Sequence, residues 1–443
     1  MWDKGTVMDA GRISLHDFAL TRYAGIVSAI AIVLLLLAAH LADAQSFTVL
    51  HNFTGGADGS EPAAQLTLDR PGNLYGTASL GGSDNCVDDR MVGCGTAFKL
   101  ARHGSSWTFN VLYTFLGGSD GQYPETAVVF GPDGALYGTT AEGGASGCFA
   151  DGCGTVFKLQ PPATFCRAVS CPWSKTTLYD FEGAATGGLP RGSPSFDRNG
   201  NLYGTTQYTG GSSPSAMVFE LGRGSWNFSV VYAFYFSQVA ATPLDGVVFD
   251  AHGNIWGTTY YGGIQNRNDP QLPDYCGVVF ELTPSGSGWT ANIVVEFQRS
   301  LGGGPSGNLI QDSAGNFYGT LQDNGPNGGG TVFQLNPNGQ LTVLASLPGS
   351  GETENGPTGG VVMDAAGNLY GVTEGGGAHS CGSVFKVAPS DGGWVLSDLH
   401  DFSCGSDGAY PYSGLAIDAS GNLYGTTFYG GTMNGGVVFE ITP

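Results

Sequence analysis

The tetrapeptide Leu74-Tyr75-Gly76-Thr77 is the first of seven closely similar stretches in this chain of 443 residues. The other copies are Leu136-Tyr137-Gly138-Thr139, Leu202-Tyr203-Gly204-Thr205, Ile255-Trp256-Gly257-Thr258, Phe317-Tyr318-Gly319-Thr320, Leu369-Tyr370-Gly371-Val372 and Leu423-Tyr424-Gly425-Thr426. Their aromatic residues follow one another at intervals of 62, 66, 53, 62, 52 and 54 residues. Self-similarity at such intervals indicates a repeat architecture, in which each unit buries its apolar faces against its neighbours.

The segment before each of these aromatic residues has a fixed length. A proline stands 13 residues before it in every copy, at Pro62, Pro124, Pro190, Pro243, Pro305, Pro357 and Pro411. An aspartate stands six residues before it in all copies but the second, at Asp69, Asp197, Asp250, Asp312, Asp364 and Asp418. Proline suits the first residue of a strand, and an Asp-x-x-Gly-Asn stretch suits a tight turn. Each unit is therefore predicted to begin with a strand from the proline to the aspartate, followed by the Leu-Tyr-Gly-Thr strand.

Two further strands complete each unit. The third has the pattern Gly-x-Val-Phe-x-Leu and spans 95–100, 154–159, 216–221, 277–282, 330–335, 382–387 and 436–441. The fourth ends in an aromatic residue, as at 111–115. The strands are apolar on both faces, and the glycine of the second strand would let an aromatic residue of the adjacent sheet come close. We therefore predict an all-β, seven-bladed β-propeller of four-stranded antiparallel blades, with two packed sandwiches as the alternative.

The two ends of the repeat region indicate how the ring closes. A strand of the fourth type occurs at 47–53, and the chain finishes with a strand of the third type at 437–441. The last blade therefore lacks its outer strand, which the N-terminal segment can supply. We expect one N-terminal strand and three C-terminal strands to share a blade, within a single domain of residues 45–443.

Residues 1–44 have the features of a secretory signal peptide. Arg12 and Arg22 precede an apolar run at 24–41, and Ala42-Asp43-Ala44 forms a small-x-small cleavage site. An uncleaved membrane anchor is the alternative, because a run of this length can just span a bilayer. The chain is expected to be secreted, either to the extracellular space or to the periplasm. An oxidising compartment also suits its nine cysteines.

The chain is strongly acidic, with 37 Asp and Glu residues against 16 Lys and Arg residues and a formal net charge of −21. Such a surface repels phosphate backbones, so nucleic acid is not an expected partner. Glycans, proteins and cations remain as ligands. We expect a monomer that contacts a membrane only through its N-terminal segment, if that segment is not cleaved.

The loops between the second and third strands differ in length. The distance from the repeated aromatic residue to the Phe of the third strand is 23, 20, 16, 24, 15, 15 and 15 residues, so blades 1, 2 and 4 have the longest loops. These loops lie on the face commonly called the top, and variable surface loops carry function. Most cysteines lie in top segments. We predict the disulfides Cys86–Cys94, Cys148–Cys153, Cys166–Cys171 and Cys381–Cys404, with Cys276 outside these pairs, and zinc ligation as the alternative.

Three links between blades share the sequence Gly-x-Asp-Gly, with the aspartates Asp58, Asp120 and Asp407. They belong to blades 1, 2 and 7, which are neighbours in a closed ring. Together they could form an acidic arc that holds Ca²⁺. The alternative is that each aspartate only folds its own link as an Asp-Gly turn. We expect no other metal and no cofactor.

Aromatic and acidic residues of the top loops are further candidates. Tyr208, Tyr260, Tyr261 and Tyr429 could stack on sugar rings, or they could pack against the next blade. Glu142 and Glu374 are also in top loops, and two carboxylates across the ring could serve a glycosidase. The sequence has no metal-binding histidine pair. It therefore favours a binding role over an enzyme and leaves the catalytic residues unassigned.

The phrase Gly-Asn-Leu-Tyr-Gly-Thr-Thr-x-x-Gly-Gly, followed by Gly-Thr-Val-Phe-Lys-Leu, resembles the bacterial tandem repeats called GloVer or choice-of-anchor repeats over residues 47–443. This resemblance implies an exported or surface protein with no assigned reaction. The repeat is also similar to blades of lactonase-like and NHL-type propellers, whose lactonases hold a central metal on acidic and Asn side chains. That ligand set does not map onto this sequence. We expect a binding propeller that holds a glycan or a protein on its top face. The alternative is an extracellular carbohydrate-active or lactone-cleaving enzyme with its site at the top of the central channel.

Overall fold

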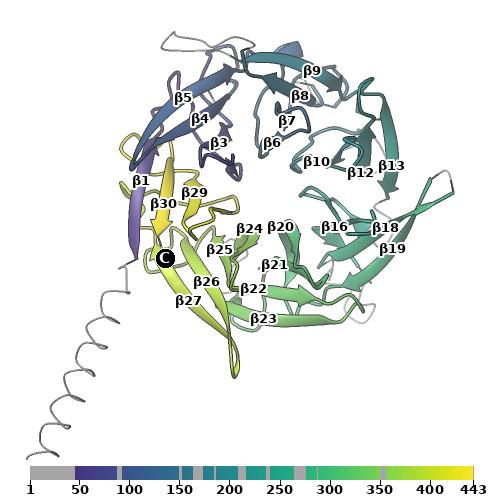
Figure 1. The fold of residues 1–443 in the computed structure, drawn as a ribbon, viewed down its shortest axis with the longest axis vertical. Coiled ribbons are helices and arrows are strands. Elements are labelled where there is room, and N and C mark those ends of the chain that lie inside the picture. Colours follow the sequence, from purple (N-terminus) through teal and green to yellow (C-terminus); the bar gives the residue numbers. More distant parts are fainter. Residues whose placement is uncertain are drawn as a thin grey trace, which may run out of the picture. The chain divides into compact units, whose positions relative to one another are not determined.

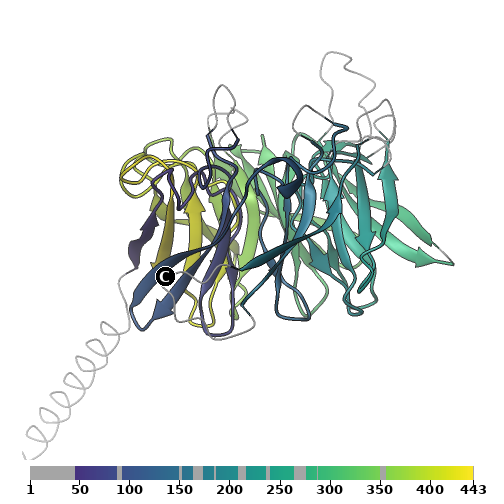
Figure 2. The same cartoon turned by 90° about the horizontal axis from the view of Figure 1, so that it is seen from above.

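Seven antiparallel sheets of four strands each surround a central channel in the described part of the chain (Figure 1). This computed structural model describes residues 45–86, 92–148, 152–162, 173–183, 186–207, 216–235, 240–263, 276–286, 288–349 and 356–442. The predicted signal peptide lies outside these residues. Figure 2 shows the ring from the side, with loops gathered along its two faces. The seven-bladed propeller expected from the repeat is therefore confirmed.

Each blade runs from an inner strand to an outer strand. Blade 1 consists of β2 (Thr67–Leu68), β3 (Leu74–Ala78), β4 (Thr96–His103) and β5 (Ser106–Thr114). Blade 2 consists of β6 (Val129–Phe130), β7 (Leu136–Thr140), β8 (Thr155–Gln160) and β9 (Ser174–Asp180). Blade 3 consists of β10 (Ser195–Phe196), β11 (Leu202–Thr206), β12 (Ala216–Leu221) and β13 (Phe228–Phe234). Blades 4 and 5 are β15 (Val248–Phe249), β16 (Ile255–Thr259), β18 (Val278–Ser285) and β19 (Gly288–Glu296); and β20 (Gly303–Gln311), β21 (Phe317–Asp323), β22 (Gly328–Leu335) and β23 (Leu341–Pro348). Blades 6 and 7 are β24 (Pro357–Met363), β25 (Leu369–Thr373), β26 (Ser383–Ser390) and β27 (Gly393–Asp401); and β28 (Ala416–Ile417), β29 (Leu423–Thr427), β30 (Val437–Thr442) and β1 (Ser46–Asn52). Two short strands form a separate sheet. β14 (Ala240–Ala241) precedes blade 4 in the sequence, and β17 (Tyr261–Gly262) lies between its strands β16 and β18.

The ring closes where β1 pairs with β30, so one N-terminal strand and three C-terminal strands form blade 7, as predicted (Figure 1). The backbone N–H of Phe53 donates to the carbonyl of Gly436 at 3.0 Å. Phe47 of β1 also stacks on His400 of β27, with ring centroids 3.9 Å apart. The N-terminal strand is therefore held by blades 6 and 7 together.

The hydrophobic core lies between the blades. Seven apolar clusters each combine side chains of two adjacent blades, and together they cover all seven junctions of the ring. At the junction of blades 1 and 2, for example, Tyr75 packs with Leu136 and Phe157. Strands that are apolar on both faces are therefore explained by burial on both sides of each sheet.

The glycine of the Leu-Tyr-Gly-Thr strand makes room for a phenylalanine of its own blade. A Cβ at Gly76 would lie 2.6 Å from Phe98 Cζ and 2.8 Å from Leu66 Cδ2. Phe98 is the registered partner of Gly76 in the neighbouring strand β4. The sequence-based expectation of an aromatic residue from the adjacent sheet was therefore wrong. The Phe98 ring lies over Gly76 within its own blade and also belongs to the apolar cluster between blades 7 and 1.

The inner strands are shorter than predicted in five blades. In blade 1 only Thr67–Leu68 pair with β3, although the predicted strand began at Pro62. In blades 5 and 6 the inner strand reaches up to the proline, as in β24 (Pro357–Met363). Residues just after the proline line the cavity in every blade, but only in blades 5 and 6 does strand pairing extend back to the proline.

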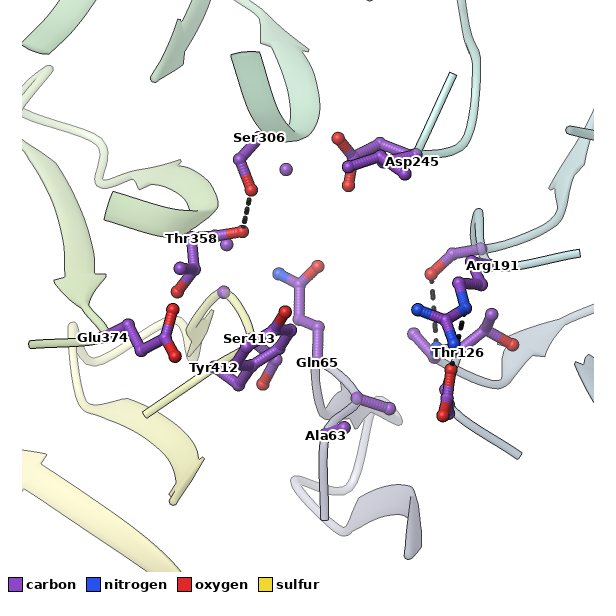
Figure 3. A pocket seen from close by; sticks show the side chains of 18 of the residues that line it. Ala63, Gln65, Thr126, Arg191, Asp245, Ser306, Thr358, Glu374, Tyr412 and Ser413 are labelled. Carbon is purple, nitrogen blue, oxygen red and sulfur yellow. Dashed lines mark hydrogen bonds and ion pairs between the residues drawn. The ribbon is translucent and has the colours of Figure 1, made fainter. Parts of the chain in front are cut away.

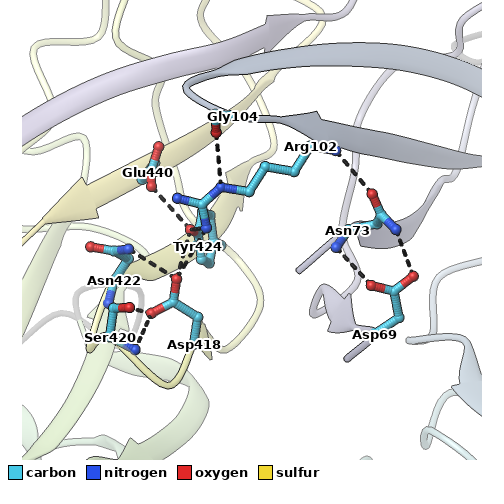
Figure 4. A network of polar contacts seen from close by, with 9 residues as sticks. All are labelled: Asp69, Asn73, Arg102, Gly104, Asp418, Ser420, Asn422, Tyr424 and Glu440. Atoms are coloured by element: carbon cyan, nitrogen blue, oxygen red, sulfur yellow. Dashed lines mark hydrogen bonds and ion pairs between the residues drawn. The ribbon is translucent and has the colours of Figure 1, made fainter. Parts of the chain in front are cut away.

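The repeated aspartate caps the first hairpin of each blade. Asp69 Oδ1 accepts a hydrogen bond from the backbone N–H of Asn73 at 2.8 Å, and its Oδ2 accepts from Asn73 Nδ2 at 2.7 Å (Figure 4). Blade 2, which lacks this aspartate, uses Asp133 instead. Asp133 Oδ2 accepts from Tyr137 Oη at 3.1 Å and pairs with Lys158 Nζ at 2.6 Å. The recurring aspartates are therefore structural.

Candidate functional site

A cavity of about 570 Å³ opens at the mouth of the central channel (Figure 3). Its volume lies in the range of small-molecule sites. Every blade contributes residues that follow its repeated proline by one to three positions. The residue directly after the proline is Ala63, Glu125, Arg191, Leu244, Ser306, Thr358 or Tyr412, according to the blade. The seven-fold scaffold therefore presents a different side chain to the cavity from each blade.

A strained turn leads the chain into this cavity wall. The residue before the proline has a positive φ in six blades, at Glu61 (54°), Tyr123 (58°), Leu189 (52°), Thr242 (59°), Gly304 (60°) and Tyr410 (55°). Residues other than glycine rarely adopt this conformation, and it is held only where surrounding contacts enforce it. The N–H of Tyr410 donates to the carbonyl of Cys381 in the preceding blade at 2.8 Å. The turn therefore joins two blades and fixes the direction of the cavity-lining residues.

Glycines in the inner segments allow neighbouring blades to meet through their backbones. A Cβ at Gly307 would lie 1.9 Å from the backbone N of Gly360, and a Cβ at Gly359 would lie 1.9 Å from the backbone N of Gly414. No other residue fits at these positions without moving a blade. The glycines therefore serve packing around the channel, and the chemistry of the cavity comes from the residues beside them.

Glu125 and Arg191 form an ion pair on the wall made by blades 2 and 3. Arg191 Nε lies 3.2 Å from Glu125 Oε2. Burial raises the pKa of the Glu125 carboxyl, and the positive charge of Arg191 acts in the opposite direction. The two side chains come from equivalent positions of adjacent repeats. This part of the wall is close to neutral because the two charges compensate each other.

Asp245 of blade 4 is a second buried carboxyl group of the cavity. Burial raises its pKa to about 7, although a hydrogen bond from the backbone N–H of Gly307 acts in the opposite direction. Its Oδ2 is buried and has no hydrogen-bond partner among the described residues. Asn308 of blade 5 also has a buried Oδ1 for which the described residues provide no partner. Figure 3 shows Asp245 and Glu374 pointing into the cavity from different sides, with Gln65 between them.

An aromatic wall made by blade 7 lines the cavity. It consists of Tyr410, Tyr412, Phe428 and Tyr429. Tyr412 and Phe428 have ring centroids 6.0 Å apart, and Phe428 and Tyr429 have centroids 4.8 Å apart with nearly perpendicular rings. The side chain of Tyr412 is 48 % exposed, which leaves its ring accessible from the cavity. The site therefore combines one aromatic wall with walls of carboxylates, amides and hydroxyl groups.

The family model described as the Gloeobacter/Verrucomicrobia repeat matches residues 39–269 and 271–443. The chain belongs to this repeat family. The resemblance drawn from the repeat phrase is confirmed. No curated protein matches this family member in sequence.

Solved structures similar to this Gloeobacter/Verrucomicrobia repeat protein share only low sequence identity. A proposed 6-phosphogluconolactonase of Bacteroides fragilis NCTC 9343 is 16% identical over 76% of this chain and 85% of its own, with a TM-score of 0.47. PorZ, a surface component of the type-IX secretion system of Porphyromonas gingivalis, is 15% identical over 85% of this chain and 46% of its own, with a TM-score of 0.46. An auxiliary nutrient binding protein of Bacteroides ovatus ATCC 8483 is 12% identical over 90% and 76%, with a TM-score of 0.44. At these values the similarities carry no argument about ligand or activity.

The structure places two of the predicted site residues of the repeat protein in the cavity, Glu374 and Tyr429. Three others lie outside its lining. Tyr260 Oη donates to Asp323 Oδ2 at 3.1 Å, Tyr261 belongs to β17, and Glu142 accepts from Gln122 Nε2 at 3.2 Å. Tyr208 lies outside the described residues.

Each aspartate of the predicted acidic arc accepts a hydrogen bond from a backbone N–H of its own link between blades. Asp58 Oδ2 accepts from the N–H of Thr54 at 3.0 Å, and Asp407 Oδ2 accepts from the N–H of Ser403 at 2.9 Å. Asp120 accepts from the N–H of Leu116 at 2.9 Å and pairs with Lys175 Nζ at 3.0 Å. Within the described ranges, no three His, Cys, Asp or Glu side chains are gathered so that they could hold a metal ion. Calcium binding by these links stays a prediction.

Three disulfides are present among the described residues, Cys86–Cys94, Cys148–Cys153 and Cys381–Cys404, and all three are predicted pairs. Cys166 and Cys171 lie outside these residues. Cys276 is buried. The part of the chain that the structure describes has no helix long and apolar enough to cross a membrane.

Sequence reasoning missed Arg191, Asp245, Asn308 and Tyr412 as site residues. The signal that could have found them is the contrast between a constant framework and its variable positions. Proline and aromatic residue keep a fixed spacing in all copies, whereas the three residues after the proline differ in charge, size and polarity. Variation inside a rigid segment marks positions that do not build the blade.

Proposed function

We propose that this repeat protein is an exported binding propeller that holds a small glycan in the channel-mouth cavity. The observation that carries the proposal is the aromatic wall of blade 7 facing hydrogen-bonding side chains of the other blades. The apolar face of a sugar ring can pack on tyrosine rings, while its hydroxyl groups bind carboxylates and amides. The three disulfides and the signal-like segment at residues 1–44 support export.

The orientation of the polar groups supports a preformed site. Gln65 Nε2 donates to the carbonyl of Leu415 at 2.6 Å, which fixes the position of the amide. Ser306 Oγ donates to the backbone carbonyl of Thr358, and Thr358 Oγ1 donates to the carbonyl of Pro411 at 3.3 Å, so these two side chains also have defined positions. A site whose side chains are already held loses less conformational entropy when a ligand binds.

The test is glycan binding by the full chain produced with its own N-terminal segment. We expect retention on a glycan array and a measurable Kd by calorimetry for at least one retained oligosaccharide. Tyr412→Ala should weaken binding by about fivefold, because stacking on an aromatic ring contributes on the order of 1 kcal/mol. Tyr261→Ala removes a tyrosine outside the cavity and should leave the Kd unchanged. Failure of the array to retain the protein would contradict the proposal.

A glycosidase acting in the same cavity is the second candidate, because Asp245 has a raised pKa and Glu374 lines the same space. A carboxyl group with a pKa near neutrality can donate a proton to a leaving group. Release of reducing ends from a retained oligosaccharide, abolished in Asp245→Asn, would establish catalysis. Binding without turnover would establish the binding role. A lactone-cleaving activity is tested in the same preparation with an aldonolactone.

A further inference from the structure

We infer that the glycan held in the channel-mouth cavity carries a free ammonium group, which binds Asp245 of blade 4, so that amino sugars are preferred over N-acetylated or neutral ones. This inference rests on the proposed function and narrows its ligand class. It starts from two acceptor atoms on adjacent blades, Asp245 Oδ2 and Asn308 Oδ1, which are buried without a hydrogen-bond partner among the described residues. Buried acceptors without a donor are rare in folded proteins and call for an explanation.

The two acceptors belong to one small region of the cavity wall. Asp245 accepts a hydrogen bond from the N–H of Gly307, the residue before Asn308. Asn308 Oδ1 lies 3.1 Å from the position that a Cβ would take at Gly246, the residue after Asp245. Both residues line the cavity. Asp245 and Asn308 therefore form one part of the wall, where a carboxyl group and an amide, both able to accept hydrogen bonds, lie side by side.

The charges around the cavity favour a cation. Three carboxyl groups line it, from Glu125, Asp245 and Glu374, against a single guanidinium, from Arg191. That guanidinium is bound to Glu125 at 3.2 Å. The charges of all four residues act on the hydroxyl group of Tyr412, so they surround one common space. A hydroxyl group of a neutral sugar supplies a donor but no charge, whereas an ammonium group supplies three donors and compensates the carboxylate.

The aromatic wall suits an amino sugar better than a bare metal ion. Tyrosine faces attract both the C–H face of a sugar and a neighbouring ammonium group. Calcium needs six to eight oxygen ligands. In the regions that the structure describes, no cluster of three acidic, His or Cys side chains offers such a set. An ammonium group needs only a few acceptors, and Asp245 and Asn308 provide them.

The experiment compares a tetramer of glucosamine with the corresponding tetramer of N-acetylglucosamine, by calorimetry on the full chain at pH 7. We expect the amine form to bind about tenfold tighter, as one close charge pair can achieve. Asp245→Asn keeps the size of the side chain and removes its charge. This variant should lose the preference for the amine, so that the two tetramers bind with similar Kd values. Asp391→Asn, which changes an exposed carboxylate in the hairpin between β26 and β27, should keep the preference.

Each other outcome overturns the inference and separates it from the proposed function. Equal binding of the two tetramers, or a preference that survives Asp245→Asn, rejects the ammonium site but keeps glycan binding. Binding of neither tetramer, while other glycans are retained on the array, rejects the amino sugar alone. A melting temperature raised by CaCl₂ in the wild type but not in Asp245→Asn would assign the two oxygens to a metal ion instead. A similar preference for the amine in a chain with Asp245→Ala would show that the net charge of the surface is responsible.

Discussion

Arg102 Nη1 of β4 lies 3.4 Å from Asp418 Oδ2, the carboxylate that caps the first hairpin of blade 7 (Figure 4). The two residues are 316 positions apart in the chain, and the contact crosses the seam at which the ring closes. The same guanidinium lies 3.4 Å from Tyr424 Oη and 5.5 Å from the ring of Trp107. One side chain of the first blade therefore reaches the cap, the repeat tyrosine and a packed tryptophan at the last junction.

Arg102→Ala should destabilise the propeller by about 1 kcal/mol, because the ion pair is partly exposed but the side chain also packs on Trp107. Urea denaturation followed by tryptophan fluorescence measures this change. Arg198→Ala removes an exposed arginine from the first hairpin turn of blade 3 and should alter stability by less than about 0.5 kcal/mol. Equal stability of the two variants would show that the contact adds nothing to ring closure.

Gly76→Ala tests the close approach inside the blades. The added methyl group would lie 2.6 Å from Phe98 Cζ, so the ring must move within a packed junction. We expect a loss of about 1 to 3 kcal/mol, which is typical of overpacked cores. Gly288→Ala is the matched control, because β19 has open space there and no heavy atom lies within 4 Å of the new Cβ. A Gly76→Ala variant as stable as this control would mean that the blades tolerate a wider spacing.

The sequence predicts the scaffold well because the scaffold repeats. Seven copies of one spacing determine the strand order, and the unequal ends at β1 and β30 determine how the ring closes. The site could not be predicted in the same way. Asp245 and Tyr412 come from blades on different sides of the channel, and only the closed ring brings them to one cavity. Hydrophobic periodicity describes how a blade packs, but it does not show which loop ends converge at the axis.

The hairpin caps should make the propeller sensitive to acid. Burial alone would raise the pKa of Asp312, but hydrogen bonds from Asn316 and Tyr318 hold it below its usual value. Asp364 and Asp418 have lowered pKa values for the same reason. A carboxyl group with a lower pKa in the folded state stabilises the fold above its unfolded pKa of about 4 and loses this contribution as the pH falls further.

We therefore expect the urea midpoint to fall between pH 5 and pH 3. Asp312→Asn should lower stability at pH 6 by about 1 kcal/mol and reduce the slope of stability against pH. Asp391→Asn, in the exposed hairpin between β26 and β27, should have the same slope as the wild type. A midpoint that does not change down to pH 3 would contradict a stabilising role for the caps.

Asp245 should have the opposite effect on stability. Burial raises its pKa from the usual range to about 7, so folding favours the protonated carboxyl. Stability from this group is fully present below the unfolded pKa of about 4 and is lost as the pH rises through about 7. Asp245→Asn removes the charge and should raise stability at pH 8 by roughly 1 to 4 kcal/mol, with little effect at pH 4.

Thermal unfolding of the wild type and Asp245→Asn at both pH values measures this difference. The other charged and titratable groups that line the cavity are Glu125, Arg191, Glu374, Tyr410, Tyr412 and Tyr429. Burial raises the pKa of Tyr412, so its hydroxyl group does not ionise in this range. Glu374→Gln, which changes another carboxyl group of the same cavity, separates a specific effect of Asp245 from a general loss of negative charge. If Asp245→Asn is less stable than the wild type at pH 8, the ionised carboxylate already has a partner that stabilises it, and the cavity would not need a cationic ligand to compensate it.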